Sequence, residues 1–307
     1  MEWQASYREL HQRGELARRA AAAMEHMKAC DLCAQHCGVD RFTTTGACRT
    51  GVQARIASYG AHHGEEDPLR GRRGSGTIFF AWCNLQCAYC QNADISQFPA
   101  GREVAPEELA AVMLALQANG CHNINLVSPS HVVAPILAAL VLAAESGLTL
   151  PLVYNTGGYD SLEALSLLDG VVDMYMPDMK YSDPHVGERL SHVKDYPAMN
   201  RLAVKEMHRQ VGDLVLSEDG IAQRGLLVRH LVLPGGLSGT REVLHFLANA
   251  ISRNTYLNLM DQYHPAHHAR EHPPLHRRLT RDEFQTALNT AAEFGLTRLD
   301  QRRRLAF

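Results

Sequence analysis

The stretch from Gly74 to Ser96, GSGTIFFAWCNLQCAYCQNADIS, decides how this chain can fold. Its apolar start predicts a buried β-strand, Thr77–Trp82, which leads into a loop that carries Cys83, Cys87 and Cys90. Three thiolates so close together suit a soft metal cluster, and because a [4Fe–4S] cluster takes four cysteines, three leave one iron open. The alternatives are a three-cysteine zinc site and unligated core thiols, although zinc motifs usually space their ligands as paired C-x2-C units.

The composition of the whole chain narrows the class of protein. Its 307 residues include 30 Lys and Arg against 33 Asp and Glu, a formal charge of −3, which leaves no basic surplus for nucleic acid or a membrane surface. The longest apolar run, residues 132–144, is too short to span a bilayer, and the first residues, MEWQASYREL, lack a signal-peptide pattern. Its eight cysteines are clustered, which fits metal ligation in a reducing compartment. We therefore expect a cytoplasmic protein without nucleic-acid or membrane partners.

A second cysteine-rich segment precedes the first. Residues 5–28 predict a helix, and Cys30, Cys33, Cys37 and Cys48 follow it with the spacing C-x2-C-x3-C-x10-C. Four thiolates close a site for zinc or for a second [4Fe–4S] cluster, and spacing alone does not choose between them. The competing interpretation is a loop with buried, unligated cysteines. Residues 55–73 predict a polar connector with a solvated or docking loop at 62–67, which divides the chain into domains 1–73 and 74–307.

The rest of the chain alternates between strands and helices. Further strands are predicted at residues 123–127, 152–155, 172–176, 226–233 and 256–260, and helices at 106–119, 131–146, 161–168, within 195–211, and at 240–253 and 281–295. Thr280 and Glu283 form a capping-box pattern, and residues 213–224 predict a hairpin. Alternation of six strands with helices implies an α/β fold with a parallel sheet, either an open (β/α)6 barrel or a doubly wound sheet.

Both of these folds bind ligands at the carboxyl ends of the strands. Polar residues follow the predicted strands there, at 128–131, 155–158, 176–180, 229–230 and 234–236. Serine and asparagine can hydrogen-bond an amino acid or a ribose, and Lys180 or Arg229 can meet a carboxylate. The competing interpretation is structural, with Ser128 as a turn residue and Asp178 paired with Lys180.

With these segments in view, the chain resembles radical S-adenosylmethionine (SAM) proteins related to pyruvate formate-lyase activating enzymes, in the branch with an N-terminal cysteine module. The resemblance runs from about Ala29 to the last helix and is carried by RGSGTIFFAWCNLQCAYCQNADISQ, INLVSPSH, YNTGGYD, MYMPDMKY, LVRHLVLPGG and NLMDQYHP. It implies a partial (β/α)6 TIM-like barrel, which favours the barrel over the doubly wound sheet. It also implies a [4Fe–4S] cluster whose open iron binds SAM, and reductive cleavage of SAM to a 5′-deoxyadenosyl radical.

The resemblance also suggests roles for single residues. It implies that Cys83, Cys87 and Cys90 ligate the cluster and that Tyr89 lies near the adenine, and the further candidates for cofactor binding are Ser128, Asn155, Asp178, Lys180 and Arg229. Two positions depart from the pattern. Residues 127–130 replace a Gly-Gly-Glu segment that binds the methionyl amine in many relatives, and Asn155 replaces an Asp of a monovalent-cation site.

The implied partners are a low-potential electron donor such as flavodoxin or ferredoxin, and a glycyl-radical enzyme that loses hydrogen from a glycine. The alternatives are a radical SAM enzyme that acts on another peptide or a small molecule, and a non-enzymatic metal-binding assembly protein. We interpret the histidine-rich residues 261–276 as a solvated loop that closes the open edge of the barrel, rather than as a metal site. Arg302–Arg304 predict a solvated basic end, and Cys121 a core thiol at the start of the second strand.

Overall fold

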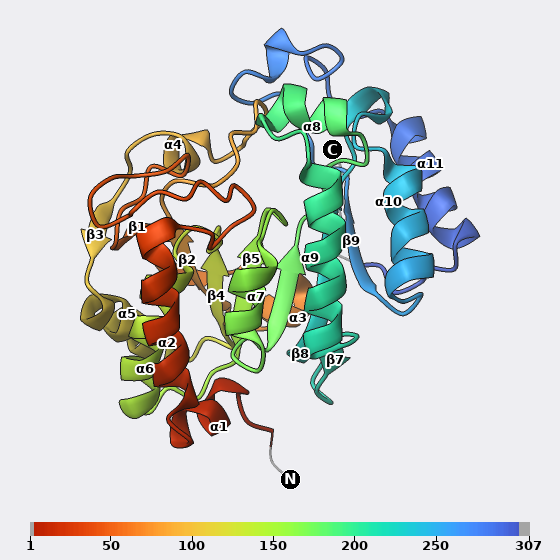
Figure 1. The fold of residues 1–307 in the computed structure, drawn as a ribbon. Coiled ribbons are helices and arrows are strands. Elements are labelled where there is room, and N and C mark those ends of the chain that lie inside the picture. Colours follow the sequence, from red (N-terminus) through yellow and green to blue (C-terminus); the bar gives the residue numbers. More distant parts are fainter. Residues whose placement is uncertain (1–2, 301–307) are drawn as a thin grey trace.

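A sheet of parallel strands forms the centre of the fold (Figure 1). The structure, a computed structural model, describes residues 3–300. The parallel strands, in the order in which they pair, are β2 (Ser75–Phe80), β4 (Ile124–Val127), β5 (Leu152–Thr156), β6 (Met174–Pro177), β8 (Ala222–Leu231) and β9 (Tyr256–Met260). Among the described strands, β9 pairs with β8 but not with the strands at the other edge, so the barrel stays open. The predicted α/β fold, a partial (β/α)6 barrel, is confirmed.

The helices connect these strands much as the sequence predicts. They are α1 (Tyr7–Gln12), α2 (Glu15–His26), α3 (Asp67–Arg70), α4 (Ala93–Ser96), α5 (Pro106–Ala118), α6 (Val133–Glu145), α7 (Leu162–Leu168), α8 (Pro184–Ser191), α9 (Tyr196–Val211), α10 (Thr240–Phe246) and α11 (Arg281–Glu293). The predicted N-terminal helix is divided into α1 and α2 at Gly14, whose φ of 70° is left-handed. The Thr280–Glu283 capping box is confirmed, and β7 (Val215–Leu216) pairs with β8 in the predicted hairpin.

The predicted connector at residues 55–73 is wrong. Residues 54–62 form strand β1 (Ala54–His62), which pairs antiparallel with β2, and β3 (Arg102–Val104) pairs with β1 at the edge of the sheet. The predicted solvated loop is also wrong in part, because Glu65 and Glu66 are buried. The polar, exposed face of β1 conceals this strand from sequence reasoning, because an antiparallel strand needs only one buried face. The sheet therefore begins before Gly74, and the domain boundary at residues 73 and 74 stays a prediction.

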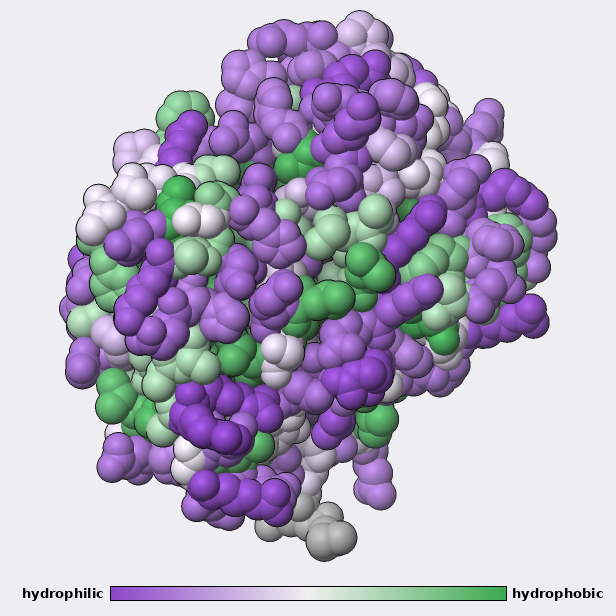
Figure 2. Space-filling view, viewed as in Figure 1, coloured by the Kyte–Doolittle hydropathy of each residue, from purple (hydrophilic) through white to green (hydrophobic). Residues whose placement is uncertain are grey.

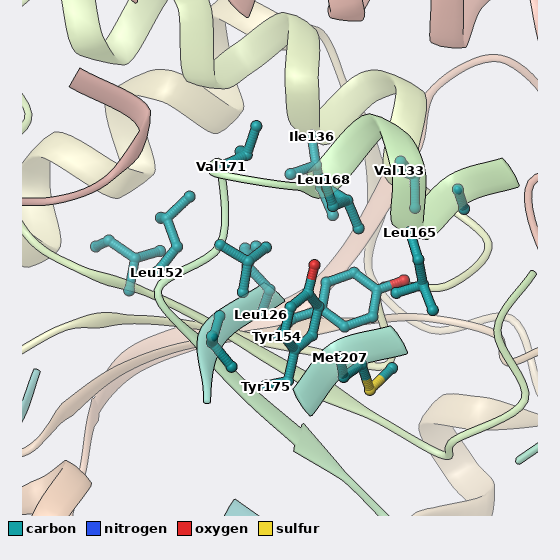
Figure 3. Close-up of a cluster of buried hydrophobic side chains, with 14 of the residues drawn as sticks. Leu126, Val133, Ile136, Leu152, Tyr154, Leu165, Leu168, Val171, Tyr175 and Met207 are labelled. Carbon is teal, nitrogen blue, oxygen red and sulfur yellow. The ribbon is translucent and has the colours of Figure 1, made fainter. Parts of the chain in front are cut away.

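Alternation along the strands divides the core into an outer and an inner part. Figure 3 shows Leu126, Tyr154 and Tyr175 from neighbouring strands packed against the helices, together with Leu165 and Met207. The intervening residues face the inside of the barrel, where Val153, Met174 and Met176 form a separate apolar cluster. At the carboxyl ends of the strands the inward positions become polar, which is where a ligand can be bound.

The surface is mostly hydrophilic on the side in view, with apolar residues grouped near its centre over α7 and α9 (Figure 2). Within residues 3–300, no helix is long and apolar enough to cross a membrane. The predicted basic end, Arg302–Arg304, lies outside the described residues. Cys121 is buried in the core immediately before β4, as predicted.

Candidate active site

The cysteine loop begins where the chain leaves β2. Trp82 has a left-handed φ of 67°, which costs a side-chain-bearing residue on the order of 1–2 kcal/mol. The Trp82 N–H donates to the Ile95 carbonyl at 3.0 Å, and the Arg49 guanidinium lies 5.2 Å from the centre of the Trp82 ring. These contacts hold a sharp change of direction, which sends Cys83 back over the end of the barrel.

One cavity of about 240 Å³ collects the predicted site residues at this end of the barrel. Its lining includes all three loop cysteines and every other predicted cofactor contact: Cys83, Cys87, Cys90, Tyr89, Ser128, Asn155, Asp178, Lys180 and Arg229. They come from the ends of four parallel strands and from the loop after β2. The sequence separation of these residues is large, so only the barrel brings them together.

An ion-pair cluster forms one wall of the cavity. The carboxylate of Asp178 accepts hydrogen bonds from Lys180 Nζ at 2.7 Å and from Arg229 Nε at 2.9 Å. The Arg229 guanidinium also donates to Asn155 Oδ1 at 2.6 Å. Burial works to raise the pKa of Asp178, but the charges of Arg229 and Lys180 outweigh it and hold that pKa below its ordinary value. One carboxylate thus faces two cations, and the charges of buried Glu65 and Glu66 also act on Arg229.

Backbone contacts fix the position of this cluster. The Asp178 carbonyl accepts hydrogen bonds from Tyr196 Oη at 3.0 Å and from Asn200 Nδ2 at 2.9 Å. Gly158, with a φ of 75°, lies so close that an added Cβ would stand 2.2 Å from both the Asn200 amide nitrogen and the Asp178 carbonyl oxygen. The Gly157–Gly158 pair after β5 is therefore required for close backbone approach, as the glycines there predict.

Ser128 and Tyr89 line other parts of the cavity. Ser128 has a left-handed φ of 57°, and its N–H donates to the Asn155 carbonyl at 2.8 Å, which joins the ends of β4 and β5. Tyr89 is buried and packs edge-on against Tyr181 and Tyr263, with ring centres 6.3 and 6.1 Å away. The Tyr89 ring thus gives the cavity an aromatic surface beside the cysteines.

The chain is similar to proteins of a known family. Residues 77–217 match the family described as the Radical SAM superfamily. The uncharacterized protein MJ0674 of Methanocaldococcus jannaschii is 33% identical over 279 residues, which cover 88% of this chain and 76% of that relative. This chain belongs to the radical SAM superfamily.

Two more distant similarities accompany that match. The uncharacterized protein MJ0808 of the same organism is 25% identical over 224 residues, which cover 70% of this chain and 59% of that protein. Among solved structures, a structure of TYW1 with a lysine-pyruvate adduct bound aligns with a TM-score of 0.43 and 12% identity, covering 71% of this chain and 73% of that chain. Radical SAM enzymes cleave SAM reductively at a [4Fe–4S] cluster and generally need a reductant such as flavodoxin or ferredoxin.

The donor set of the cavity fits the cluster of a radical SAM enzyme. Cys83, Cys87 and Cys90 are free thiols that border one cavity, and three thiolates leave one of four irons for SAM. Within the described residues, no three His, Cys, Asp or Glu side chains converge to hold a single metal ion. A cluster does not require such convergence, because each cysteine takes a different iron. Burial raises the pKa of the Cys83 thiol to about 12, so its thiolate needs the positive charge of bound iron.

Sequence reasoning missed a hydrogen bond to one of these cysteines. The Ser191 hydroxyl donates to Cys87 Sγ at 3.0 Å, and Tyr181 Oη lies 2.7 Å from Ser191 Oγ. Because the single Ser191 hydrogen is directed to sulfur, Tyr181 is the donor to Ser191. Both side chains are buried. Ser191 ends α8, a helix that the sequence reading did not predict, and it lies 104 residues from Cys87 along the chain. No local pattern could have identified it.

Some polar residues expected at the rim lie elsewhere. Ser130 hydrogen-bonds Thr156 behind the cavity at 2.9 Å, and His131 is buried with Nε2 3.0 Å from the Ala81 carbonyl. Burial lowers the pKa of His230 to about 4, and its two nitrogens contact Met179 and Thr240. None of these side chains, nor residues 234–236, lines the cavity. They support the strand ends rather than a ligand.

The histidine-rich segment lies at the open edge of the barrel, where the sequence predicted it, and it also contributes a residue to the cavity lining. Residues 261–276 contain a short 3-10 turn, Ala269–Glu271, and lie in the loop beside α8 at the top of Figure 1. Gln262 and Met260 line the cavity, while Tyr263 is buried and its hydroxyl donates to the Leu275 carbonyl at 2.6 Å. Gln91 of the cysteine loop reaches His264, with Nε2 and Nδ1 3.3 Å apart. The loop thus borders the open side of the barrel.

Proposed function

We propose that this protein cleaves SAM in the cavity described above and directs the 5′-deoxyadenosyl radical to a C–H bond of a peptide segment of a partner protein. The observation that carries the proposal is the single cavity that joins three free thiols to the Asp178, Lys180 and Arg229 cluster. When bound, the cluster supplies the electron that breaks a carbon–sulfur bond of SAM. A glycine in a glycyl-radical enzyme is the first candidate target, on the resemblance of the motif segments.

The charges of the cavity support SAM as the ligand. Lys180 and Arg229 bring two cationic groups to its lining, which suit the carboxylate of the methionyl group. Asn155 and Ser128 offer uncharged hydrogen-bonding groups beside that charge, and Tyr89 offers an aromatic surface for a base. In this proposal, Cys83, Cys87 and Cys90 hold the cluster and the other residues orient SAM.

The size of the cavity supports a target that approaches from outside. Ligand pockets usually measure about 300–1,000 Å³, and this cavity of about 240 Å³ would be taken up by the cofactors. A peptide loop can present one C–H bond at the rim, beside Gln91 and Gln262, without entering fully. The radical requires contact at about 3–3.5 Å, so the segment must be held closely. One alternative is a small molecule as the target of the radical. Another is a protein without catalytic activity that uses its metal site in assembly.

Release of 5′-deoxyadenosine tests the chemistry. Anaerobically reconstituted protein with dithionite and SAM is expected to release it, and Cys87→Ala is expected to lose all turnover, because one cluster ligand is removed. Cys121→Ala is the matched control, since Cys121 is also buried but lies outside the cavity, and it is expected to retain turnover. Turnover in a variant with Ala at positions 83, 87 and 90 would refute the proposal.

Isotope transfer tests the target. A glycyl-radical enzyme with α-deuterated glycine, incubated with this protein, SAM and reductant, is expected to pass deuterium to 5′-deoxyadenosine. The same enzyme with unlabelled glycine is expected to show a carbon-centred doublet in electron paramagnetic resonance, because the remaining α-hydrogen splits the signal. Deuterium that arrives from a metabolite instead would keep SAM cleavage and remove the peptide target.

A further inference from the structure

The four cysteines before the barrel come together in space. The Cys30 N–H donates to the Val39 carbonyl and the Gly38 N–H to the Cys30 carbonyl, both at 2.9 Å, which closes a tight loop around Cys33 and Cys37. Cys33 lies near enough to Cys30 and to Cys48 for their charges to interact, and Cys30 likewise to Cys37. All four are free thiols. Two separate stretches thus bring these four cysteines near one another, each within reach of at least one of the others.

The second stretch is fitted closely to the first. A Cβ on Gly46 would stand 2.6 Å from Cys37 Sγ, so only glycine lets this backbone pass beside the sulfur. Buried Arg41 donates to the carbonyls of Thr50 and Gly51 and lies 4.0 Å from Cys30 Sγ. A guanidinium beside a group of thiolates offsets part of their negative charge. The segment has the packing of a ligand shell rather than of a solvated loop.

This segment lies directly against the cysteine loop of the cavity. The Asn84 side chain lies close enough to the Cys33 thiol to work against the rise that burial causes in its pKa, and Asn84 Oδ1 lies 3.8 Å from Cys83 Sγ. Gln35 donates to the Asn84 carbonyl at 2.7 Å, and Asn84 Nδ2 donates to the Tyr159 carbonyl at 2.6 Å. One buried amide therefore spans the gap between a cysteine of each group.

We propose that Cys30, Cys33, Cys37 and Cys48 hold a second [4Fe–4S] cluster, which passes single electrons to the cavity cluster across Asn84. The role as a relay rests on the proposed function, whereas the cluster itself does not. Four thiolates leave no iron open, so such a cluster can carry electrons but cannot bind SAM. The short path through Asn84 gives it a redox neighbour, which a structural zinc ion would not need.

The electron enters from outside at the exposed end of this segment. Cys37 is the exposed cysteine of the four, whereas Cys30, Cys33 and Cys48 are buried. A low-potential one-electron donor reduces the second cluster by one electron, and the same electron then reduces the cavity cluster. No atom or proton is transferred, and the donor is oxidised by one electron for each SAM cleaved.

Metal analysis tests the site without any need for SAM cleavage. Anaerobically reconstituted protein is expected to hold about eight irons and eight sulfides, and a variant with Ala at positions 83, 87 and 90 about four of each. Cys121→Ala, which removes a cysteine outside both groups, is expected to keep about eight irons. About four irons in the wild-type protein, or zinc in place of iron, would overturn the proposal.

Magnetic coupling tests the relay. Two reduced clusters joined across one side chain are expected to broaden each other's electron paramagnetic resonance signals. The wild-type spectrum should therefore be broader than the sum of the spectra of the two separate clusters. The variant that lacks the cavity cysteines should show a narrow, uncoupled signal. If the spectrum of protein with both clusters equals the sum of the two separate spectra, the proposed relay is refuted.

A second variant keeps the ligand assignment testable if larger changes disturb folding. Cys37→Ser alters an exposed side chain and is expected to fold. It should change the spectrum of the second cluster and leave the cavity cluster as in the wild type. An unchanged spectrum would overturn Cys37 as a ligand.

Discussion

At the scale of single residues, the Ser191 side chain changes the surroundings of a cysteine sulfur in the cavity, that of Cys87. Its hydrogen bond to Cys87 Sγ, supported by Tyr181, is buried and therefore strong. Hydrogen bonds to ligand sulfur stabilise the more negative, reduced cluster and so raise its reduction potential. With Cys87 as a cluster ligand, as proposed above, we infer that Ser191 acts as a positioning residue that sets how readily the cluster accepts an electron.

Ser191→Ala is expected to lower the midpoint potential of the cavity cluster by the equivalent of about 1 kcal/mol, the net value of one hydrogen bond. Tyr181→Phe should shift it in the same direction by less, because Ser191 keeps its bond to sulfur. Ser166→Ala, which removes an exposed hydroxyl that bonds Glu163, is the matched control and should leave the potential unchanged. A spectroscopic redox titration measures all three, and an unchanged potential in Ser191→Ala contradicts this role.

At the scale of elements, α11 is held at its start by one carboxylate. Glu283 accepts hydrogen bonds from Arg277 at 2.8 Å, from the Thr280 N–H at 2.9 Å and from the Gly235 N–H at 2.7 Å. The sequence predicts the capping box, but the bond from Gly235 ties α11 to the segment after β8, and Arg277 joins it to the residues just before the helix. The Arg277 hydrogen bonds, with the backbone bonds, hold the pKa of Glu283 well below its ordinary value.

Glu283→Gln is expected to loosen the start of α11 by about 1–2 kcal/mol at neutral pH. Because the folded-state pKa of Glu283 is depressed, its contribution is present above its unfolded-state pKa and is lost as the pH falls below that value. The difference between variant and wild type should therefore shrink in acid. Hydrogen exchange of the α11 amides measures it, with Glu271→Gln, an exposed partner of His268, as control. Equal protection in wild type and Glu283→Gln at neutral pH would contradict the prediction.

At the scale of the whole molecule, the first 73 residues and the barrel share contacts that separate domains lack. Strand β1 pairs with β2 along most of its length, from the pair of Ile56 with Phe80 to the pair of His62 with Ser75. The Arg41 guanidinium donates to the His131 carbonyl at 2.7 Å, and α2 packs against α6. We expect residues 1–73 and 74–307 to unfold as one unit.

The two tryptophans test this expectation, because Trp3 and Trp82 report on the two parts separately. Fluorescence of Trp82→Phe and Trp3→Phe, followed through denaturant unfolding, is expected to give coincident transitions. Two transitions at different denaturant concentrations would instead support the division at residues 73 and 74. A protein with reconstituted clusters is used throughout, so that metal loss does not separate the curves.

The sequence by itself determined the superfamily and the type of fold, and it predicted the cysteine ligands of the loop. The spacing of Cys83, Cys87 and Cys90 is local, and strand and helix periods are set by neighbouring residues, so both can be read along the chain. The sequence also indicated Asp178, Lys180 and Arg229, because residues after parallel strands meet at one edge. It failed for β1, because the polar, exposed face of this strand hides its period.

Only the tertiary structure decided which of these residues share a cavity and what surrounds them. The hydrogen bond from Ser191 to Cys87 and the contact of Asn84 with Cys33 join segments far apart in sequence. His131 and His230, in contrast, follow strands as the site residues do, yet point away from the cavity. Side-chain direction at a strand end depends on the local turn and on packing partners, which the sequence pattern does not specify.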